Sequence, residues 1–134
     1  LRRRAIALHD SPCIRWIDDS LPRLRSVARL GETFALIVVA GVWTHLDEGE
    51  RRESMRTMAS LLSPAGILVL SVRQGPAPAG RRTFPVASHE TAASAESRGL
   101  EKVLDVEAQS LQPANRAAGV KWNWLAFRRA EPRR

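Results

Sequence analysis

Two strand patterns flank an amphipathic helix in the middle of the chain, and this arrangement constrains the fold more than any other feature. Residues 34–42, FALIVVAGV, form an unbroken apolar run rich in β-branched residues, and residues 67–72, ILVLSV, form a second one. Unbroken apolarity is typical of strands buried on both faces, as in a parallel sheet covered by helices. The sequence therefore predicts a strand–helix–strand unit with a right-handed crossover.

The helix between these strands has a clear start signal. Asp47 stands three residues before Glu50, the spacing of a capping box, in which each side chain bonds the other residue's backbone N–H. Apolar residues then recur at helical spacing and predict the stripe that faces the sheet: Met55, Met58, Ala59 and Leu62. We expect the opposite face to be exposed to solvent, and it carries Arg51, Arg52, Glu53 and Arg56. The turn SPAG, residues 63–66, ends the helix.

The C-terminal half predicts one further helix and two antiparallel strands. Residues 74–87 form a long Gly/Pro/Ala/Arg-rich loop, after which Ser88 is placed to cap a short helix that ends near Gly99. Strands are predicted at 103–108 and 121–128, and a connection without a helix (residues 110–119) makes neighbouring strands antiparallel. Because both faces of the last strand are apolar, we expect Trp122 and Trp124 to lie in the core.

Upstream of this region the patterns are weaker. Residues 2–9 and 22–30 are helix candidates, and Cys13–Ile17 is a candidate for a short strand. Cys13 is the single cysteine and cannot form an internal disulfide, which favours a cytoplasmic protein.

Composition excludes several classes of function. The net charge is +7, but the arginines are spread along the chain apart from its two ends, so a nucleic-acid partner is not expected. The longest apolar run is far shorter than the roughly 20 residues that span a bilayer, so no membrane partner is expected. Three histidines and one cysteine lack metal-ligand spacing, which predicts no metal site.

The order of these elements resembles a known family. Residues 34–76, FALIVVAGVWTHLDEGERRESMRTMASLLSPAGILVLSVRQGP, resemble the middle of class I S-adenosylmethionine-dependent methyltransferases, with a strand, a segment ending in His-Leu, a helix, a turn and an ILVLS strand. WIDDSLPRL, residues 16–24, resembles the segment after the family's third strand. The resemblance covers about residues 13–128.

The resemblance implies an α/β fold: a Rossmann-like methyltransferase sheet, mainly parallel, with an antiparallel C-terminal hairpin. The family's Gly-rich cofactor turn has no counterpart, since no Gly-x-Gly spacing occurs. The implied fold therefore lacks the first two strands, and residues 1–134 form a single, partial and N-terminally truncated domain. Ala65 replaces the first glycine of the family's Pro-Gly-Gly turn, a change that is tolerated if its φ stays negative.

The resemblance also implies a site for S-adenosylmethionine. Asp19, Ser20 and Leu21 would lie beside the adenine, and Gly41, Val42 and Trp43 beside the methionine end. His45 would lie close to the methyl acceptor, where a neutral imidazole could take the acceptor's proton as a catalytic base.

Each of these assignments has a structural alternative. Asp19 could cap the following helix. His45 could hydrogen-bond the helix after it, with Trp43 packed underneath. On the 74–87 loop, Arg81 and Arg82 could contact an acidic substrate or simply be solvated.

Two hypotheses of different classes follow. In the first, the chain is a methyltransferase, or the C-terminal part of one, that acts on a small-molecule acceptor. In the second, it is a catalytically inactive, methyltransferase-like interaction module. With the family's first strand absent, residues 34–42 would form a hydrophobic edge without proline or charge. Either Cys13–Ile17 fills that edge, or a second copy does; we expect a homodimer built from residues 1–42.

Overall fold

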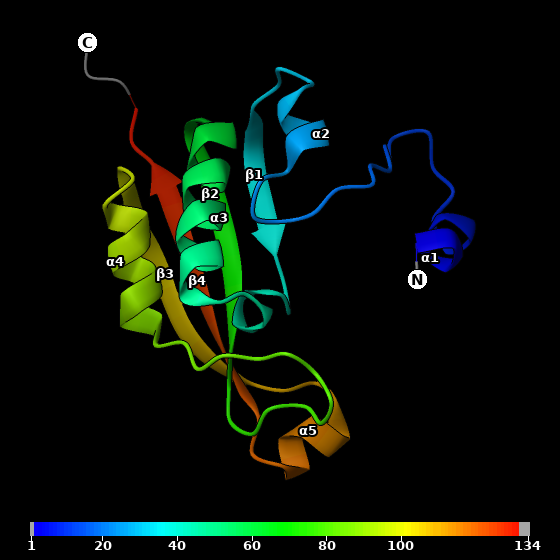
Figure 1. Ribbon diagram of the computed structural model, residues 1–134, viewed down its shortest axis with the longest axis vertical. Helices are drawn as coiled ribbons and strands as arrows, with labels where there is room; N and C mark the ends of the chain where they lie inside the picture. The colour runs from blue at the N-terminus through cyan, green and yellow to red at the C-terminus, as the bar shows by residue number, and fades with distance from the viewer. Residues whose placement is uncertain (1, 132–134) are drawn as a thin grey trace.

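The computed structural model describes residues 2–131 and shows a four-stranded sheet with two helices packed on one face (Figure 1). The sheet order is β1-β2-β4-β3; β1 pairs parallel with β2, and β4 is antiparallel to both of its neighbours. This is the predicted α/β class with its antiparallel C-terminal hairpin. In chain order the elements are α1 (Arg2–Leu8), α2 (Arg25–Ala28), β1 (Phe34–Val39), the 3-10 helix η1 (Trp43–His45), α3 (Glu48–Leu61), β2 (Leu62–Gln74), α4 (Ser88–Glu96), β3 (Leu100–Gln109), α5 (Pro113–Ala117) and β4 (Lys121–Arg129).

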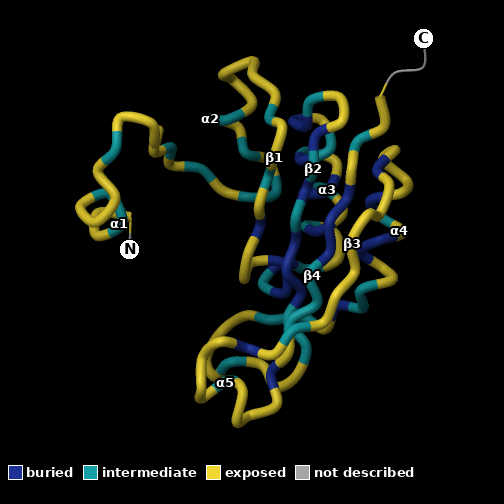
Figure 2. The backbone as a smooth tube through the Cα atoms, turned by 180° about the vertical axis from the view of Figure 1, so that it is seen from behind, coloured by how far each residue is buried: buried dark blue, intermediate teal, exposed yellow. Residues whose placement is uncertain are grey.

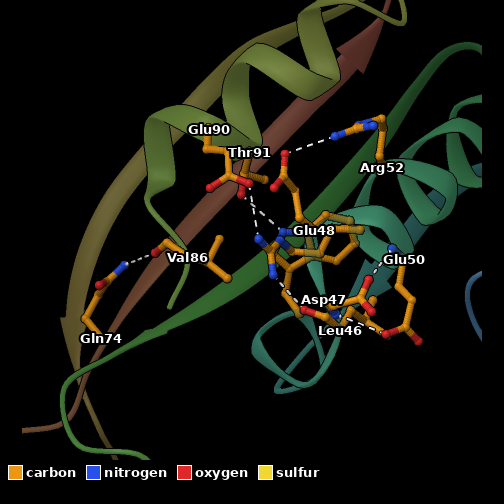
Figure 3. Close-up of polar contacts among 11 residues, drawn as sticks. Leu46, Asp47, Glu48, Glu50, Arg52, Gln74, Val86, Glu90 and Thr91 are labelled. Atoms are coloured by element: carbon orange, nitrogen blue, oxygen red, sulfur yellow. Dashed lines mark hydrogen bonds and ion pairs between the residues drawn. The ribbon is translucent and has the colours of Figure 1, made fainter. Parts of the chain in front are cut away.

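The central strand–helix–strand unit forms as predicted, and its capping box is present. The Asp47 carboxylate accepts from the Glu50 N–H at 2.8 Å, and the Glu50 carboxylate accepts from the Asp47 N–H at 3.1 Å (Figure 3). Met55 and Met58 are fully buried in the core, as predicted, whereas Ala59 is only partly buried and the buried Leu62 is the first residue of β2 instead of part of the helix. Local spacing therefore sets both where α3 begins and which face it buries.

The prediction that Arg51 is solvated is wrong. Its side chain is 8% exposed, its guanidinium donates to the Leu46 carbonyl at 2.6 Å, and it pairs with Glu90 of α4 at 3.1 Å. A buried guanidinium needs such partners to offset lost hydration. Arg51 thus connects α3 to α4, which pack side by side on the sheet (Figure 1).

The sheet has one covered and one open face. Beneath α3 and α4 lie the core side chains Leu68, Leu70, Val72, Leu125 and Phe127. Within residues 2–131 no helix covers the other face, as the view from behind shows (Figure 2). There Leu36 and Val38 remain 59% and 57% exposed. The expectation that both faces of residues 34–42 are buried is therefore wrong for the described part of the chain.

The same asymmetry overturns the placement of the two strand tryptophans. Side chains alternate along β4, so Leu125 and Phe127 point into the core while Trp122 and Trp124 belong to the open face. Both tryptophans are half-buried rather than core residues. Sequence apolarity alone did not reveal which face the helices cover.

The SPAG segment, residues 63–66, lies within β2 rather than in a turn before it, and its backbone differs from the expected one. Ala65 has a φ of +61°. Alanine in place of the family's glycine was expected to be tolerated only if this φ were negative. A Cβ in the left-handed region is strained. The next residue, Gly66, is required by space, since a Cβ there would lie 2.7 Å from the Ser63 carbonyl oxygen and 2.9 Å from that of Phe34.

The N-terminal segment contributes no strand. Cys13–Ile17 is irregular and runs away from the sheet (Figure 1), so it does not fill the outer edge of β1. An isolated segment has no ladder partner for its N–H and C=O groups. β1 is therefore an edge strand in the described chain, as the homodimer prediction requires. The 22–30 helix is reduced to the single turn of α2.

Two features of the C-terminal half also differ from the sequence-based prediction. Ser88 is the first residue of α4 and makes no capping bond, since the N-cap position belongs to Ala87. The predicted 110–119 loop contains α5, with a proline in its first turn, where a missing N–H costs nothing. No helix within residues 2–131 is long and apolar enough to cross a membrane.

Candidate functional site

A cavity of about 720 Å³ lies at the carboxyl ends of β1 and β2. In open α/β sheets ligands bind at this end of the strands. The walls come from the segment after β1, the loop after β2, and the connection between β3 and β4. The lining residues are Ala40, Gly41, Thr44, His45, Ser71, Arg73, Pro78, Arg81, Ala108, Gln109, Ser110, Leu111, Gln112, Asn115, Trp122 and Trp124.

The end of β1 turns sharply into this cavity. Gly41 has a φ of +70°, which favours glycine, and its N–H donates to the Ser71 hydroxyl of β2 at 2.8 Å. Trp43 then turns inward: it is 1% exposed, and its indole N–H donates to the Thr91 hydroxyl of α4 at 3.1 Å. Anchoring Trp43 in the core brings the following residues of η1 to the cavity wall.

His45 has a defined tautomer in this arrangement. Its Nδ1 lies 2.9 Å from the carbonyl oxygen of Arg82. A carbonyl can only accept, so Nδ1 carries the proton and donates it. In the neutral imidazole this leaves Nε2 with a free lone pair. A side chain that lines a cavity with such a lone pair can accept a proton.

The loop over the cavity, residues 75–87, is held to the body of the protein at several points. The Phe84 N–H donates to the Thr44 carbonyl at 2.8 Å. The Arg82 guanidinium pairs with Asp47 at 3.1 Å and Glu50 at 2.8 Å. Gln74 donates to the Val86 carbonyl at 3.4 Å (Figure 3). Arg82 is thus engaged by α3 and fixes the carbonyl that orients His45, whereas Arg81 lines the cavity.

Asp19 lies in a different hollow, of about 370 Å³, lined also by Ser20 and by Glu50 and Glu53 of α3. Its carboxylate accepts from the Val27 N–H at 2.9 Å and from the Ser20 N–H at 3.0 Å. The Val27 N–H, with further backbone N–H groups of α2, lowers the pKa of Asp19. Asp19 therefore stabilises α2, which is the structural alternative given above.

Solved structures with similar folds decide the family resemblance. NodS, an N-methyltransferase from Bradyrhizobium japonicum WM9, matches 75% of this chain at 25% identity with a TM-score of 0.53. Its complex with S-adenosylhomocysteine matches at 27% identity with a TM-score of 0.55. An O-methyltransferase family protein from Burkholderia thailandensis matches 98% of this chain with a TM-score of 0.67, at 16% identity. This chain has the fold of class I S-adenosylmethionine-dependent methyltransferases.

The methyltransferase fold is present here over only part of its usual length. The chain spans 53% and 48% of the two NodS structures and 41% of the Burkholderia protein. No family model and no curated protein matches the sequence.

Within this methyltransferase fold, the predicted site residues separate into three places. Gly41 and His45 line the large cavity, and Val42 between them is 38% exposed. Asp19 and Ser20 line the smaller hollow. Leu21 packs against the edge of the core. The Trp43 side chain lies in the core and is 1% exposed, so its place beside the methionine end of the cofactor stays a prediction for the backbone of this residue.

Most of the cavity residues were not among the predicted site residues, and they include four side chains of β2 and β4: Ser71, Arg73, Trp122 and Trp124. The signal for them was the period of two along β2 and β4, which puts all four on the face opposite the core. Within residues 2–131 no group of three or more His, Cys, Asp or Glu side chains could hold a metal ion.

Proposed function

We propose that this chain is a methyltransferase, or the C-terminal part of one, that transfers a methyl group from S-adenosylmethionine to a small-molecule acceptor. The observation that carries the proposal is the cavity at the carboxyl ends of β1 and β2, which His45 lines with its Nδ1 bonded to the Arg82 carbonyl, so that Nε2 is the nitrogen left for an acceptor. The likeness to NodS bound to S-adenosylhomocysteine supports it. We propose a cytoplasmic location, because the single cysteine cannot form an internal disulfide.

In methyl transfer the protein mainly has to position the acceptor next to the methyl group. When bound, S-adenosylmethionine supplies a methyl group that passes from sulfonium sulfur to an acceptor oxygen or nitrogen, and S-adenosylhomocysteine leaves. The acceptor loses one proton, and the Nε2 of His45 takes it. The Arg82 carbonyl stabilises the resulting imidazolium because the Nδ1–H bond is already in place. The remaining rate acceleration comes from the orientation of the acceptor relative to the methyl group and the base.

The residues of this chain fit one side of the cofactor. Gly41 and Val42 are both exposed, and a Cβ built at Gly41 would meet no other atom within 4 Å. Asp19, Ser20 and Leu21 remain the proposed adenine contacts, although both Asp19 oxygens already accept one bond each. A carboxylate has room for further donors.

Calorimetry with S-adenosylmethionine tests the proposal. We expect binding at micromolar affinity by this chain and a loss of at least tenfold in Gly41→Ala. Gly31→Ala is the matched control, because Gly31 also has a positive φ and open space around its Cα but lies outside the cavity. Equal affinity in all three proteins would show that the cofactor does not bind next to Gly41. No binding by the unmodified chain would favour the second candidate function.

That second candidate is a catalytically inactive interaction module. Its support is the open apolar face, with Leu36 and Val38 exposed beside the unpaired edge of β1. We propose that a second copy pairs with this edge and forms a homodimer through residues 1–42. The homodimer is compatible with either function, because the cavity lies at the ends of the strands.

A further inference from the structure

We propose that the acceptor is an aromatic carboxylate, with its ring against Trp122 and Trp124 and its carboxylate on Arg73 and Arg81. This inference rests on the proposed function and names the substrate class of that same cavity. Four observations carry it: the charge of the lining, the placement of the tryptophans, the orientation of Arg73, and the size of the space.

The cavity is lined by cations and by no carboxylate. Arg73 and Arg81 both contribute to its wall, and no Asp or Glu does. Among residues 2–131, neither arginine lies within an ion-pair distance of a carboxylate, whereas their neighbour Arg82 pairs with Asp47 and Glu50. Two guanidinium groups without a carboxylate partner in one cavity favour an anionic ligand. A planar carboxylate matches the guanidinium fork.

The strand register puts aromatic rings beside these cations. Arg73 of β2 is directly opposite Trp122 of β4, and Ser71 is opposite Trp124. Opposed residues on neighbouring strands share one face, here the face without helices. Half-buried indoles on a sheet surface that forms a cavity wall present flat apolar area to a ligand ring.

Arg73 is oriented by its own contacts. Its guanidinium lies 5.9 Å from the Trp122 ring centroid, within cation–π range. Its Nε and one terminal nitrogen donate to the Pro76 carbonyl at 3.3 Å and 3.1 Å. The other terminal nitrogen keeps its donors for a ligand. A carboxylate bound there would lie next to the Trp122 ring, so one molecule can use both groups.

The dimensions fit a molecule of one or two rings. Cavities that hold small organic ligands are typically on the order of 300–1,000 Å³, and this one measures about 720 Å³. It extends from His45 beside β1 to Trp124 on β4. An aromatic acid that also carries a hydroxyl can therefore bind its carboxylate at the arginines and present its hydroxyl to His45 within the same cavity.

Binding of 6-hydroxy-2-naphthoate by calorimetry, with and without S-adenosylhomocysteine, tests the inference. We expect binding in at least one condition, and binding about tenfold weaker for 2-naphthol, which lacks the carboxylate, and for cyclohexanecarboxylate, which lacks the ring. Arg81→Ala and Trp122→Leu should each weaken naphthoate binding by a similar factor. Arg128→Ala is the matched control and should bind normally, since Arg128 lies on β4 outside the cavity and changes the net charge equally.

Several results would overturn the inference: no naphthoate binding in either condition, equal binding of naphthol, equal loss in Arg128→Ala, or displacement of the naphthoate by an equal concentration of inorganic phosphate. Because naphthoate binding is also measured without S-adenosylhomocysteine, its result is separable from the proposed function. If the chain binds naphthoate but not S-adenosylmethionine, the proposed aromatic-acid site is supported and the proposed methyltransferase function is rejected.

Discussion

At the scale of single residues, the site depends on one backbone carbonyl. The oxygen of Arg82 determines which nitrogen of His45 carries the proton, and the ion pairs of Arg82 with α3 determine where that oxygen lies. The residue that looks catalytic in the sequence is therefore oriented by a neighbour that reads as an ordinary loop arginine.

The His45 tautomer is directly measurable. We expect nitrogen NMR shifts to report a protonated Nδ1 and an unprotonated Nε2 in the neutral ring. His45→Asn should keep the bond to the Arg82 carbonyl, because the Asn amide can donate from nearly the same position, and should keep the stability of the parent. His45→Ala should lose about 1 kcal/mol with that bond. An Nε2-protonated ring would contradict the proposed base.

The stability that Asp47 contributes should depend on pH. The Glu50 N–H, together with the positive charge of Arg82, holds the pKa of the Asp47 carboxyl below its ordinary value of 3.8. A lowered pKa in the folded state means that this stabilisation is present above pH 3.8 and disappears as the pH falls through the folded-state pKa. Asp47→Asn should therefore have a lower melting temperature than the parent at pH 7, and the difference between the two melting temperatures should become smaller as the pH falls.

Melting curves between pH 7 and pH 2.5 measure this effect. Glu50→Gln is the control: its side-chain oxygen still accepts from the Asp47 N–H, so the capping box remains while one ion pair to Arg82 is lost. A gap between Asp47→Asn and the parent that stays constant with pH would contradict the assignment.

At the scale of helices and strands, local patterns were predictable and packing was not. The capping box of α3 and the Met55–Met58 stripe depend on residues within a few positions of one another, so the sequence contains all the information needed for them. Arg51 is buried because α4, some forty residues later, brings Glu90 over it. Trp122 and Trp124 line a cavity because the helices cover the other face, a property of the assembled sheet.

The first part of β2 offers a stabilising substitution. Ala65 occupies the left-handed region at φ +61°, where a Cβ costs about 1 kcal/mol relative to glycine. Ala65→Gly should therefore raise the melting temperature by a few degrees. Gly66→Ala is the matched counterpart and should lower it, because its Cβ would collide with two carbonyl oxygens. A lower melting temperature in Ala65→Gly would show that the backbone there is not strained.

The covered and open faces should respond differently to truncation. Met58→Ala removes a fully buried side chain and should cost about 2–5 kcal/mol in denaturant unfolding. Leu36→Ala, on the open face, should cost much less in the monomer, because that side chain is already largely hydrated. Equal losses at low protein concentration would indicate that the open face is covered within one chain.

At the scale of the whole molecule, the open face and the free edge of β1 lead to the homodimer prediction. Light scattering at micromolar concentration should give a mass twice the 14.9 kDa of one chain. Val38→Lys should return it to the monomer by placing a charge in the interface. Leu104→Lys is the matched control, since Leu104 is an exposed apolar residue on β3 at the opposite edge of the sheet. A monomeric parent would defeat the prediction.

The family resemblance was visible in the sequence because the order of a strand, a His-Leu segment, a capped helix and a second strand is set by short-range motifs. The location of Asp19 was not, because only the assembled chain shows its carboxylate engaged by α2 and separated from His45. The cavity itself combines residues from Ala40, just after β1, to Trp124 of β4, more than eighty positions apart, and no short-range pattern contains it.

If the carboxyl ends of β1 and β2 bind the methyl donor, S-adenosylhomocysteine should perturb the residues there. Titration of the nitrogen-labelled chain with S-adenosylhomocysteine, followed by amide NMR, measures this. We expect saturable shifts of the Gly41, Val42 and His45 amides and no shifts of the amides in the last turn of α4. Saturable shifts confined to other parts of the chain, or no shifts at millimolar ligand, would contradict it.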